Sequence, residues 1–574
     1  MLLTKITCYN GNNTNCPATG VATPFSQITT FTQLNNGPQV QMDTSYDGYG
    51  QVTGTAEYDY AAITRTRQTT IEYGTYNFTS PGCAAMSNGI IDRPCRFAVT
   101  DGTGTTVVSK SMFAYDETAV TATTGSPNHV SVTGSRGNMT TSAVQANGST
   151  TLYRKFTYYD TGTPKTSTDV SISGSTNGPT TTYSYAGTSC GNSFVTTVTL
   201  PLSLARSAGW SCTGGVMTSS TDENQKVAIF GYADPNFWRR TSVSFPDGGQ
   251  TTTTYNTVSP PWNIQISSKL DATRNIVTKT VLDTLGRTVQ SQLTSDPTGT
   301  VYTDTGYDAL GRVASVSNPY RTTTDPTYGV TSYAYDALGR VTTVTEPGGK
   351  TVLMTYTKAA TRVQDEGNGT RRITTIHQRD GLGRLTDVCE VTSATQLGIT
   401  PTPAACGLDI AAAGFLTSYQ YDTLGNLTGV DQGGLNPRSY SYDMLSRMTS
   451  ETNPESGTTT YTYDTNSAGD LYQHVGPKPN QTNASIKVTA TYTHDALHRL
   501  MFTSYDDGLT PRGRFRLRRS LGVGVHRGEP QGAAYAHQQR GGGHGLQLRR
   551  DGTIRRPVAV HALKLRHLSP ALYL

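Results

Sequence analysis

Pairs of tyrosine and aspartate recur along the sequence, and both residue types can do chemistry. Asp422, Asp443 and Asp464 each follow a tyrosine and are spaced by 21 and 21 residues. A carboxylate can act as a general acid or base, and exposed tyrosine rings can bind sugars. Glycoside hydrolysis needs two carboxylates that converge across one bond, whereas the repeat holds these aspartates one unit apart. The pattern therefore favours a structural role, in which each aspartate ends a strand and accepts backbone N–H bonds in the turn.

Other residues that could support catalysis or metal binding form no recognisable motif. His377, His474, His494 and His498 are scattered, and the last two flank Asp495 in a degenerate repeat, where histidines are usually solvent-exposed. The sequence contains no H-E-x-x-H, EF-hand or phosphate-loop pattern. We therefore expect no enzyme activity, no catalytic or metal-ligating residue and no cofactor.

The eight cysteines fall into four pairs that are local in the sequence, and no pair has the C-x2-C spacing of a zinc site. An even, locally paired count is typical of disulfides in an oxidising compartment, and unrelated buried thiols are the alternative. We predict that Cys190 pairs with Cys212 and Cys389 with Cys406. The candidate disulfide cysteines are Cys8, Cys16, Cys83, Cys95, Cys190, Cys212, Cys389 and Cys406.

The unit that contains the Tyr-Asp pair has the pattern of a β-hairpin. Tyr-x-Tyr places two rings on one face of a strand, and Asp ends that strand. Leu two residues later is expected to pack the turn onto an apolar layer. Gly supplies the positive φ of a short turn, and Arg begins a second strand of alternating Val and Thr. The predicted turn residues are Asp283, Gly286, Asp308, Gly311, Arg312, Asp336, Gly339, Arg340, Asp380, Gly383, Asp422, Gly425, Asp443, Asp464 and Asp495.

The composition agrees with a chain of stacked hairpins. Of 574 residues, 34% are hydrophobic, only 15% are charged, and 33 are tyrosine. Such a chain favours pleated sheet over helix, which excludes a helical bundle, a coiled coil and an acidic disordered chain. No apolar run is long enough for a transmembrane helix. We predict an all-β protein whose antiparallel hairpins form a long twisted or spiralling sheet, with residues 300–500 almost wholly in strands.

The repeated unit, YxYDxxGRVTxVTxPxG, resembles the YD repeat of Rhs (rearrangement hotspot) proteins, which also occurs in insecticidal Tc toxin C components and teneurins. Clear copies extend from about residue 230 to 505, and degenerate copies extend back to about residue 40. The resemblance implies a hollow β-shell, here open or incomplete, that encloses a C-terminal toxin or lies at the cell surface. The segment YYDPxxGRFxxxDP, which usually ends such shells, does not occur here, so the resemblance implies neither self-cleavage nor toxicity.

The sequence divides into three regions. Residues 1–230 contain degenerate repeats, residues 231–510 contain the YD repeats, and residues 511–574 form a basic tail rich in Arg and Gly, with a net charge of +11. We interpret the tail as a disordered or frameshift-derived segment. A basic arm for nucleic acid or anionic lipid and a small toxin domain are the alternatives. We expect the tail to add no strand to the sheet and to be dispensable after Gly508.

Two classes of function follow from these observations. The first is a non-enzymatic β-shell or cell-surface scaffold, which includes a truncated remnant of a toxin-encapsulating or delivery protein, with an enclosed polypeptide as partner. The second is an extracellular adhesive or carbohydrate-binding protein, with surface glycans as partner. Either class implies an extracellular or cell-surface location, no transmembrane segment, and no nucleic acid beyond non-specific attraction to the tail. The start of the sequence has no secretory signal, so an intracellular protein, another export route and a missing N-terminus stay open.

Overall fold

The computed structural model describes residues 3–11, 16, 21, 23–34, 37–123, 130, 132–170, 177–185, 190–234, 237–392, 403–464, 469–478, 483 and 485–514. All of them lie in one compact unit, Met1–Leu517. β-Strands joined by short turns make up this unit, together with one 3-10 turn, η1 (Pro201–Ser203). Residues 300–380 contain no helix, as the repeat pattern predicts. No helix in the described part of the chain is long and apolar enough to cross a membrane.

The first 17 strands are short and rich in Thr, Val and Tyr, the residue types that fit a pleated sheet. Their bounds are β1 (Leu3–Tyr9), β2 (Gln27–Leu34), β3 (Gln39–Tyr46), β4 (Val52–Tyr58), β5 (Arg65–Tyr73), β6 (Thr75–Asn77), β7 (Gly82–Ala84), β8 (Pro94–Asp101), β9 (Val107–Tyr115), β10 (Met139–Gln145), β11 (Thr151–Tyr158), β12 (Pro164–Val170), β13 (Thr180–Tyr185), β14 (Val195–Leu200), β15 (Leu204–Ser211), β16 (Val216–Thr221) and β17 (Val227–Gly231).

The remaining strands contain the Tyr-x-Tyr sequences, and many of them end at a tyrosine. Their bounds are β18 (Ser242–Ser244), β19 (Gln250–Asn256), β20 (Trp262–Lys269), β21 (Asn275–Leu282), β22 (Thr288–Leu293), β23 (Val301–Tyr307), β24 (Val313–Ser317), β25 (Val330–Tyr335), β26 (Val341–Thr345), β27 (Thr351–Thr357), β28 (Ala360–Gln364), β29 (Thr374–Arg379), β30 (Leu385–Val391), β31 (Gly414–Tyr421), β32 (Leu427–Gln432), β33 (Leu435–Tyr442), β34 (Met448–Asn453), β35 (Gly457–Tyr463), β36 (Leu471–Pro477), β37 (Lys487–His494), β38 (Leu500–Tyr505) and β39 (Gly513–Arg514).

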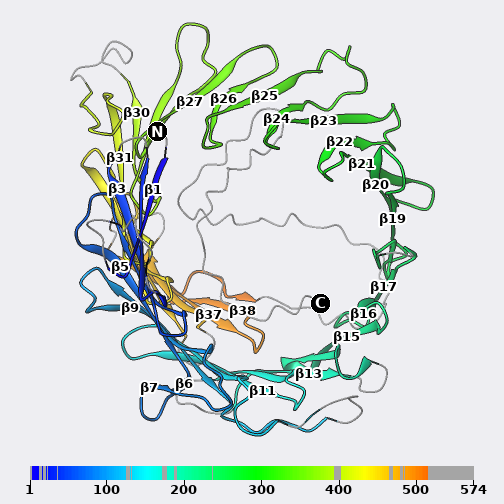
Figure 1. Cartoon of the computed structure of the whole chain (residues 1–574), viewed down its shortest axis with the longest axis vertical. Coiled ribbons are helices and arrows are strands. Elements are labelled where there is room, and N and C mark those ends of the chain that lie inside the picture. Colours follow the sequence, from blue (N-terminus) through cyan, green and yellow to red (C-terminus); the bar gives the residue numbers. More distant parts are fainter. Residues whose placement is uncertain are drawn as a thin grey trace. The chain divides into compact units, whose positions relative to one another are not determined.

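Thirty-seven of the strands in the described part of the chain form one antiparallel sheet, in which each strand pairs with the next along the chain. The exception is β5, which pairs with β8 because β6 and β7 form a small separate hairpin. In Figure 1 the strands follow one another in chain order along a curved path. The prediction of an all-β protein with a long sheet of antiparallel hairpins is therefore confirmed. The sheet continues through residue 230, where β17 pairs with β18, and the division of the repeats there stays a prediction.

The hairpins that end at a Tyr-Asp pair share a β-bulge at the tyrosine. The register between β25 and β26 shifts between Ala334 and Tyr335, and the same shift recurs at Tyr307, Tyr421 and Tyr463. A bulge inserts one extra residue into one strand, which bends that strand and re-aims its side chain. The bulge therefore turns the last tyrosine of each unit towards the preceding hairpin.

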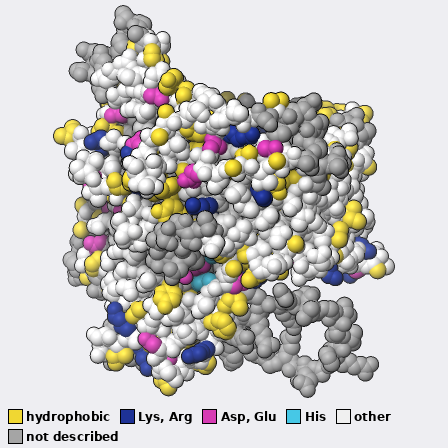
Figure 2. Space-filling model, turned by 90° about the horizontal axis from the view of Figure 1, so that it is seen from below, with side chains coloured by type: hydrophobic (Ala, Val, Ile, Leu, Met, Phe, Trp, Pro, Cys, Tyr) yellow, Lys and Arg dark blue, Asp and Glu magenta, His cyan; other side chains and the backbone are white. Residues whose placement is uncertain are grey.

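The apolar core of the described residues is small, because most strands contact mainly their neighbours in the sheet. Two clusters of buried residues occur, each next to a disulfide. The first contains Ile376 and Cys389, and the second contains Cys95 and Met112. On the face shown in Figure 2, charged side chains are few and lie scattered among hydrophobic side chains and other groups. Stability must therefore come largely from contacts between neighbouring strands and turns.

The expectation that residues 511–574 add no strand is wrong for the first of them. Gly513 and Arg514 form β39, which pairs with Thr503 and Phe502 of β38. Two backbone pairs suffice to extend an existing sheet edge, whatever the side chains. Residues 515–574 lie outside the described residues, and the interpretation of the tail stays a prediction.

Candidate functional site

Each Tyr-Asp turn is built around the carboxylate of its aspartate. In the turn after β25, Oδ1 of Asp336 accepts the backbone N–H of Leu338 at 2.9 Å and that of Arg340 at 3.0 Å. Its Oδ2 accepts Nε–H of Arg340 at 2.7 Å. The N–H of Gly339 donates to the carbonyl of Asp336, and the φ of this glycine is +77°. The aspartate thus satisfies backbone donors that the tight turn would otherwise leave unpaired.

The same arrangement recurs in five further turns of the described chain in which an aspartate lies four residues before an arginine. Asp422 departs from it, because Asn426 takes the place of arginine and donates Nδ2–H to the carboxylate at 2.9 Å. Asp464 directly follows β35, but residues 465–468 of its turn lie outside the described part. The turn pairs are Asp283–Arg287, Asp308–Arg312, Asp336–Arg340, Asp380–Arg384, Asp443–Arg447 and Asp495–Arg499.

The predicted glycines all take a positive φ, between +76° and +86°, at Gly286, Gly311, Gly339, Gly383 and Gly425. Two turns keep this conformation without glycine. Ser446 has a φ of 59° and His498 has a φ of 61°.

The electrostatics of the turns favour ionised carboxylates. The backbone N–H of Arg287 and, next, its guanidinium lower the pKa of Asp283, although burial acts in the opposite direction. At Asp308 burial raises the pKa, but the N–H groups and guanidinium of Arg312 outweigh it, so the pKa lies below its usual value. A carboxyl group used as a general acid needs a raised pKa. These aspartates are therefore poor candidates for acid catalysis.

In five of these turns the arginine also holds the tyrosine of the next unit. The guanidinium of Arg312 lies over the ring of Tyr335, 4.4 Å from its centroid, and donates to the carbonyl of Asp336 at 3.2 Å. The Tyr335 hydroxyl donates to the carbonyl of Val313 at 2.6 Å. The same stacking joins Arg287 to Tyr307, Arg340 to Tyr356, Arg384 to Tyr421 and Arg447 to Tyr463.

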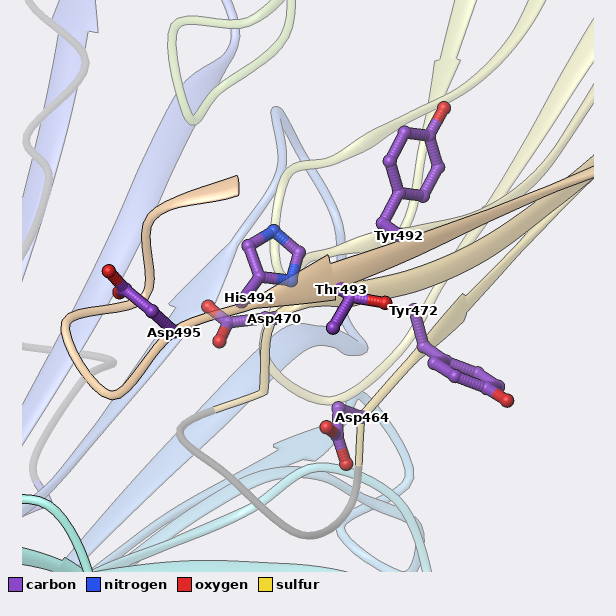
Figure 3. A pocket seen from close by; sticks show the side chains of 7 residues that line it. All are labelled: Asp464, Asp470, Tyr472, Tyr492, Thr493, His494 and Asp495. Carbon is purple, nitrogen blue, oxygen red and sulfur yellow. The ribbon is translucent and has the colours of Figure 1, made fainter. Parts of the chain in front are cut away.

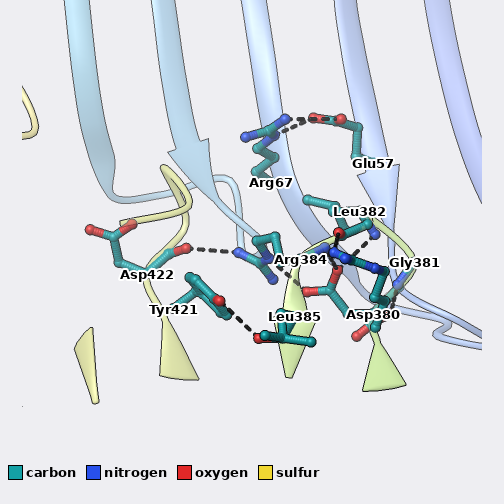
Figure 4. Close-up of polar contacts among 12 residues, drawn as sticks. Glu57, Arg67, Asp380, Gly381, Leu382, Arg384, Leu385, Tyr421 and Asp422 are labelled. Carbon is teal, nitrogen blue, oxygen red and sulfur yellow. Dashed lines mark hydrogen bonds and ion pairs between the residues drawn. The ribbon is translucent and has the colours of Figure 1, made fainter. Parts of the chain in front are cut away.

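We call this series of contacts the Asp–Arg–Tyr ladder. Figure 4 shows one step, in which Arg384 lies between Asp380 of its own turn and Tyr421 and Asp422 of the next. Burial raises the pKa of Tyr421, and the cation of Arg384 opposes this effect. At each of these five steps a partly desolvated cation–π contact and a hydroxyl–carbonyl bond therefore connect one hairpin to the next.

The N-terminal strands keep part of the ladder, which the sequence pattern did not reveal. An aromatic residue at or near a strand end donates to the carbonyl of a residue that lies within two positions of the start of the previous strand. The spacing of 15 to 21 residues between these partners is the signal that a search could have used. The donor–acceptor pairs are Tyr73–Val52, Tyr115–Pro94, Tyr158–Met139, Trp210–Val195, Tyr232–Met217 and Tyr255–Arg240.

The leucines of the turns differ in exposure, which corrects the expectation that all of them pack on an apolar layer. Leu285 is 75% exposed and Leu310 is 76% exposed. Leu382 and Leu445 are partly buried. A turn tip of a single-layered sheet points into solvent unless another part of the sheet lies against it, which explains the first two.

Three later turns do lie against strands or turns of the N-terminal region. The N–H of Gly381 donates to Oδ1 of Asp59 at 2.6 Å, and the N–H of Met444 donates to the carbonyl of Ala146 at 3.0 Å. The third contact joins His498 to an aspartate of β12, 329 residues away in the sequence. We call this line of contacts the seam. It shows that the sheet returns on itself within the unit Met1–Leu517.

Two pockets lie close to the seam. The smaller, of about 180 Å³, is lined by residues of β36, β37 and the adjoining turns, and in Figure 3 its two tyrosines, Tyr472 and Tyr492, point away from each other. Its carboxylates have partners: Asp495 binds Arg499, and Asp470 binds His498. The larger pocket, of about 400 Å³, is lined by residues between 146 and 152, by the turn that follows β33 and by the end of β35 with Asp464.

The histidines and cysteines give no metal centre in the described part of the chain. Burial lowers the pKa of His377 and of His474, and the latter bonds Tyr492 at 2.7 Å. Glu72, Cys83 and Cys95 lie close together, but the two cysteines are joined to each other and cannot act as thiolate ligands.

The structure joins all eight candidate cysteines in sequence-local pairs. Cα atoms lie 4.8 Å apart in Cys8–Cys16, 6.0 Å in Cys83–Cys95, 5.1 Å in Cys190–Cys212 and 6.1 Å in Cys389–Cys406. These separations fall within the range that disulfides require.

Comparison with known proteins points to one repeat family. Residues 321–351 and 421–458 match the RHS Repeat family, and no curated protein sequence matches the chain. The fold is similar to the crystal structure of TcdB2-TccC3, with a TM-score of 0.58 and 10% identity over 84% of this chain and 30% of that one. For the crystal structure of TcdB2-TccC3-TEV the TM-score is 0.58, with 10% identity over 85% of this chain and 33% of that one.

At this low identity the two structures show a shared fold alone, and the chain spans about a third of their length. The matched segments include the turns of Asp336 and Asp443, which the ladder connects to their neighbours. The repeat match identifies these two segments as RHS repeats, and together with the Tyr-Asp turns and the shared fold it supports an Rhs/YD-repeat protein.

Proposed function

We propose that this protein is a non-enzymatic β-shell that encloses a polypeptide following the repeats in the chain. The observation that carries the proposal is the Asp–Arg–Tyr ladder. It uses the recurring carboxylates and rings to hold one hairpin against the next, for example through Asp336, Arg340 and Tyr356. Carboxylates that backbone N–H groups and a guanidinium hold in the ionised form, such as Asp283, Asp308 and Asp336, are poorly suited to donate a proton.

The seam and the fold support enclosure. A sheet that is held to itself at Gly381, Met444 and His498 is better suited to surround a space than one whose turns are all free. The fold is similar to that of TcdB2-TccC3, a structure whose chain is about three times as long. Four disulfides support an extracellular or cell-surface location, because such bonds persist in oxidising compartments.

Protection of a reporter tests the proposal. An unfolded, protease-sensitive reporter peptide is fused after residue 574 of the full chain, and its cleavage is compared with that of the same peptide fused to a compact globular domain. Enclosure predicts a half-life at least about tenfold longer in the shell fusion, because cleavage then requires opening. Equal half-lives with an intact repeat region would overturn the proposal.

Glycan binding is the second candidate, and the larger seam pocket favours it. Tyr442, Tyr461 and Tyr463 line this pocket together with Asp443 and polar side chains, a combination that suits sugars. The shell is the stronger candidate, because the hydroxyls of Tyr461 and Tyr463 already donate to other groups of the protein. A glycan array distinguishes the two candidate functions. An adhesive protein should bind defined sugars, and this binding should be lost in Tyr442→Ala, whereas a shell should bind no sugar specifically.

A further inference from the structure

His498 occupies the turn position that glycine fills in other repeats, and its ring bridges two aspartates. Nδ1 lies 2.8 Å from Oδ2 of Asp470, and Nε2 lies 3.3 Å from Oδ2 of Asp169. Asp470 precedes β36 in the neighbouring hairpin, whereas Asp169 belongs to β12. One imidazole therefore joins the hairpin β37–β38 to the N-terminal part of the sheet.

Both ring nitrogens face carboxylates, and this arrangement depends on the protonation of the ring. A carboxylate only accepts hydrogen bonds, so both contacts are hydrogen bonds only when the imidazole carries two protons. The neutral ring has a single N–H, and its other nitrogen then presents a lone pair to a negative oxygen. Partial burial disfavours the charged ring, but the hydrogen bonds and charges of Asp470 and Asp169 outweigh burial and raise the pKa of His498.

The other charged groups around the ring are already paired. Arg154 of β11 binds Asp169 with a distance of 2.6 Å between Nε and Oδ1. On the turn of His498 itself, Arg499 is paired with Asp495. Arg447 of the turn after β33 donates to the carbonyl of Gly469, beside Asp470. The protonated ring thus adds a positive charge between two carboxylates, one of which, Asp169, also binds Arg154.

We propose that His498 is a proton-dependent latch that holds β37–β38 against β12 while the imidazole is doubly protonated, and that loosens when the ring loses a proton. The latch does not depend on what the shell encloses. For a group whose folded pKa is raised, the added stability is complete below the unfolded value of about 6.5 and is lost as pH rises through the folded value. The seam is therefore tightest at mildly acidic pH and loosens towards alkaline pH.

Hydrogen exchange of the full chain tests the latch. Amides of residues 168–170 and of β38 are followed at pH 6 and pH 9, with correction for the intrinsic rate. We expect protection to fall by about two- to fivefold between these pH values, the size of a partly exposed charge pair. In His498→Gly, which keeps the positive-φ turn of the other repeats, this pH dependence should disappear. In His494→Gln, a control in the same hairpin, it should persist.

A second measurement keeps the proposal testable if the glycine variant folds poorly. The ring of His498 is titrated by NMR in the full chain and in Asp169→Asn, which keeps an oxygen acceptor but removes the charge. The variant should have a lower pKa for His498 and no pH-dependent protection at residues 168–170. An unchanged His498 pKa in Asp169→Asn, or equal pH dependence in His498→Gly and the unaltered chain, would overturn the proposal.

Discussion

In these turns one aspartate accepts two backbone N–H groups and a guanidinium. Replacing it with asparagine should destabilise the turn, because an amide has one acceptor oxygen and no charge. Asp380 is the most informative case, since its side chain is only 5% exposed and its Oδ2 lies 2.6 Å from Nε of Arg384. We expect Asp380→Asn to lower the free energy of unfolding by about 1–3 kcal/mol.

Urea unfolding measures this change, with Asp92→Asn as the matched control. The carboxylate of Asp92 is 67% exposed and pairs only with its neighbour Arg93, so its loss should change stability by less than about 0.5 kcal/mol. Equal effects of the two substitutions would mean that Asp380 does not hold its turn.

The turn carboxylates also predict how stability depends on pH. Contacts with backbone N–H groups and guanidinium lower the pKa of Asp283, Asp308 and Asp336, and hydrogen bonds from Thr298 and Arg321 lower that of Asp296 to about 2. A lowered folded pKa gives stability that is present above the unfolded value of about 3.9 and is lost as pH falls towards the folded value. The melting temperature should therefore decrease steeply between about pH 4 and pH 2. A melting temperature that is constant or rises over this interval would contradict the role of these carboxylates.

At the scale of strands and hairpins, the ladder predicts how much the free energy of unfolding falls when a single tyrosine hydroxyl is removed. The Tyr356 hydroxyl donates to the carbonyl of Val341 at 2.8 Å, beneath the stacked guanidinium of Arg340. Tyr356→Phe should lower the free energy of unfolding by about 1 kcal/mol, because a partly buried carbonyl loses its partner. Tyr49→Phe removes the hydroxyl of a tyrosine that is 73% exposed and should change little. Indistinguishable urea midpoints for the two variants would exclude a stabilising ladder.

Removal of the disulfide Cys389–Cys406 should lower the stability of the fold by more than removal of one hydroxyl. It closes a loop of 17 residues and lies in the buried cluster with Ile376 and Ile410. Replacing both cysteines with alanine should destabilise the fold by about 3 kcal/mol, as expected for a loop of this length. The unaltered chain, denatured without reductant, should contain no thiol that reacts with an alkylating reagent. Eight reactive thiols would rule out both the disulfides and the oxidising compartment.

The hairpins could be predicted from the sequence, but the contacts between them could not. Asp336, Gly339 and Arg340 lie within five residues, so their spacing alone specifies the turn. Arg312 and Tyr335 belong to different units, and only the strand register and the β-bulge bring them together. The aromatic contacts of the N-terminal strands were missed for the same reason, because the Tyr-Asp pair itself is often absent there.

For the whole molecule, the sequence could not predict where the sheet meets itself. Asp59 and Gly381 are 322 residues apart, and their contact depends on small amounts of twist that accumulate over many strands. This is why Leu285 and Leu382, which occupy the same position in the repeat, differ in exposure. The seam thus depends on the folded sheet as a whole, and it joins the later turns to the N-terminal region.

Disulfide trapping across the seam tests the central claim most directly. Met444 directly follows Asp443 and donates its N–H to the carbonyl of Ala146, so cysteines at these two positions lie near the separation that a disulfide requires. Ala309 directly follows Asp308 in an equivalent turn with an exposed tip, which makes Ala309→Cys with Ala146→Cys the matched control. Mild oxidation should cross-link the Met444→Cys/Ala146→Cys variant nearly completely and leave the control uncross-linked. No cross-link in the first pair, or equal cross-linking in both, would contradict a sheet that returns on itself to form a shell.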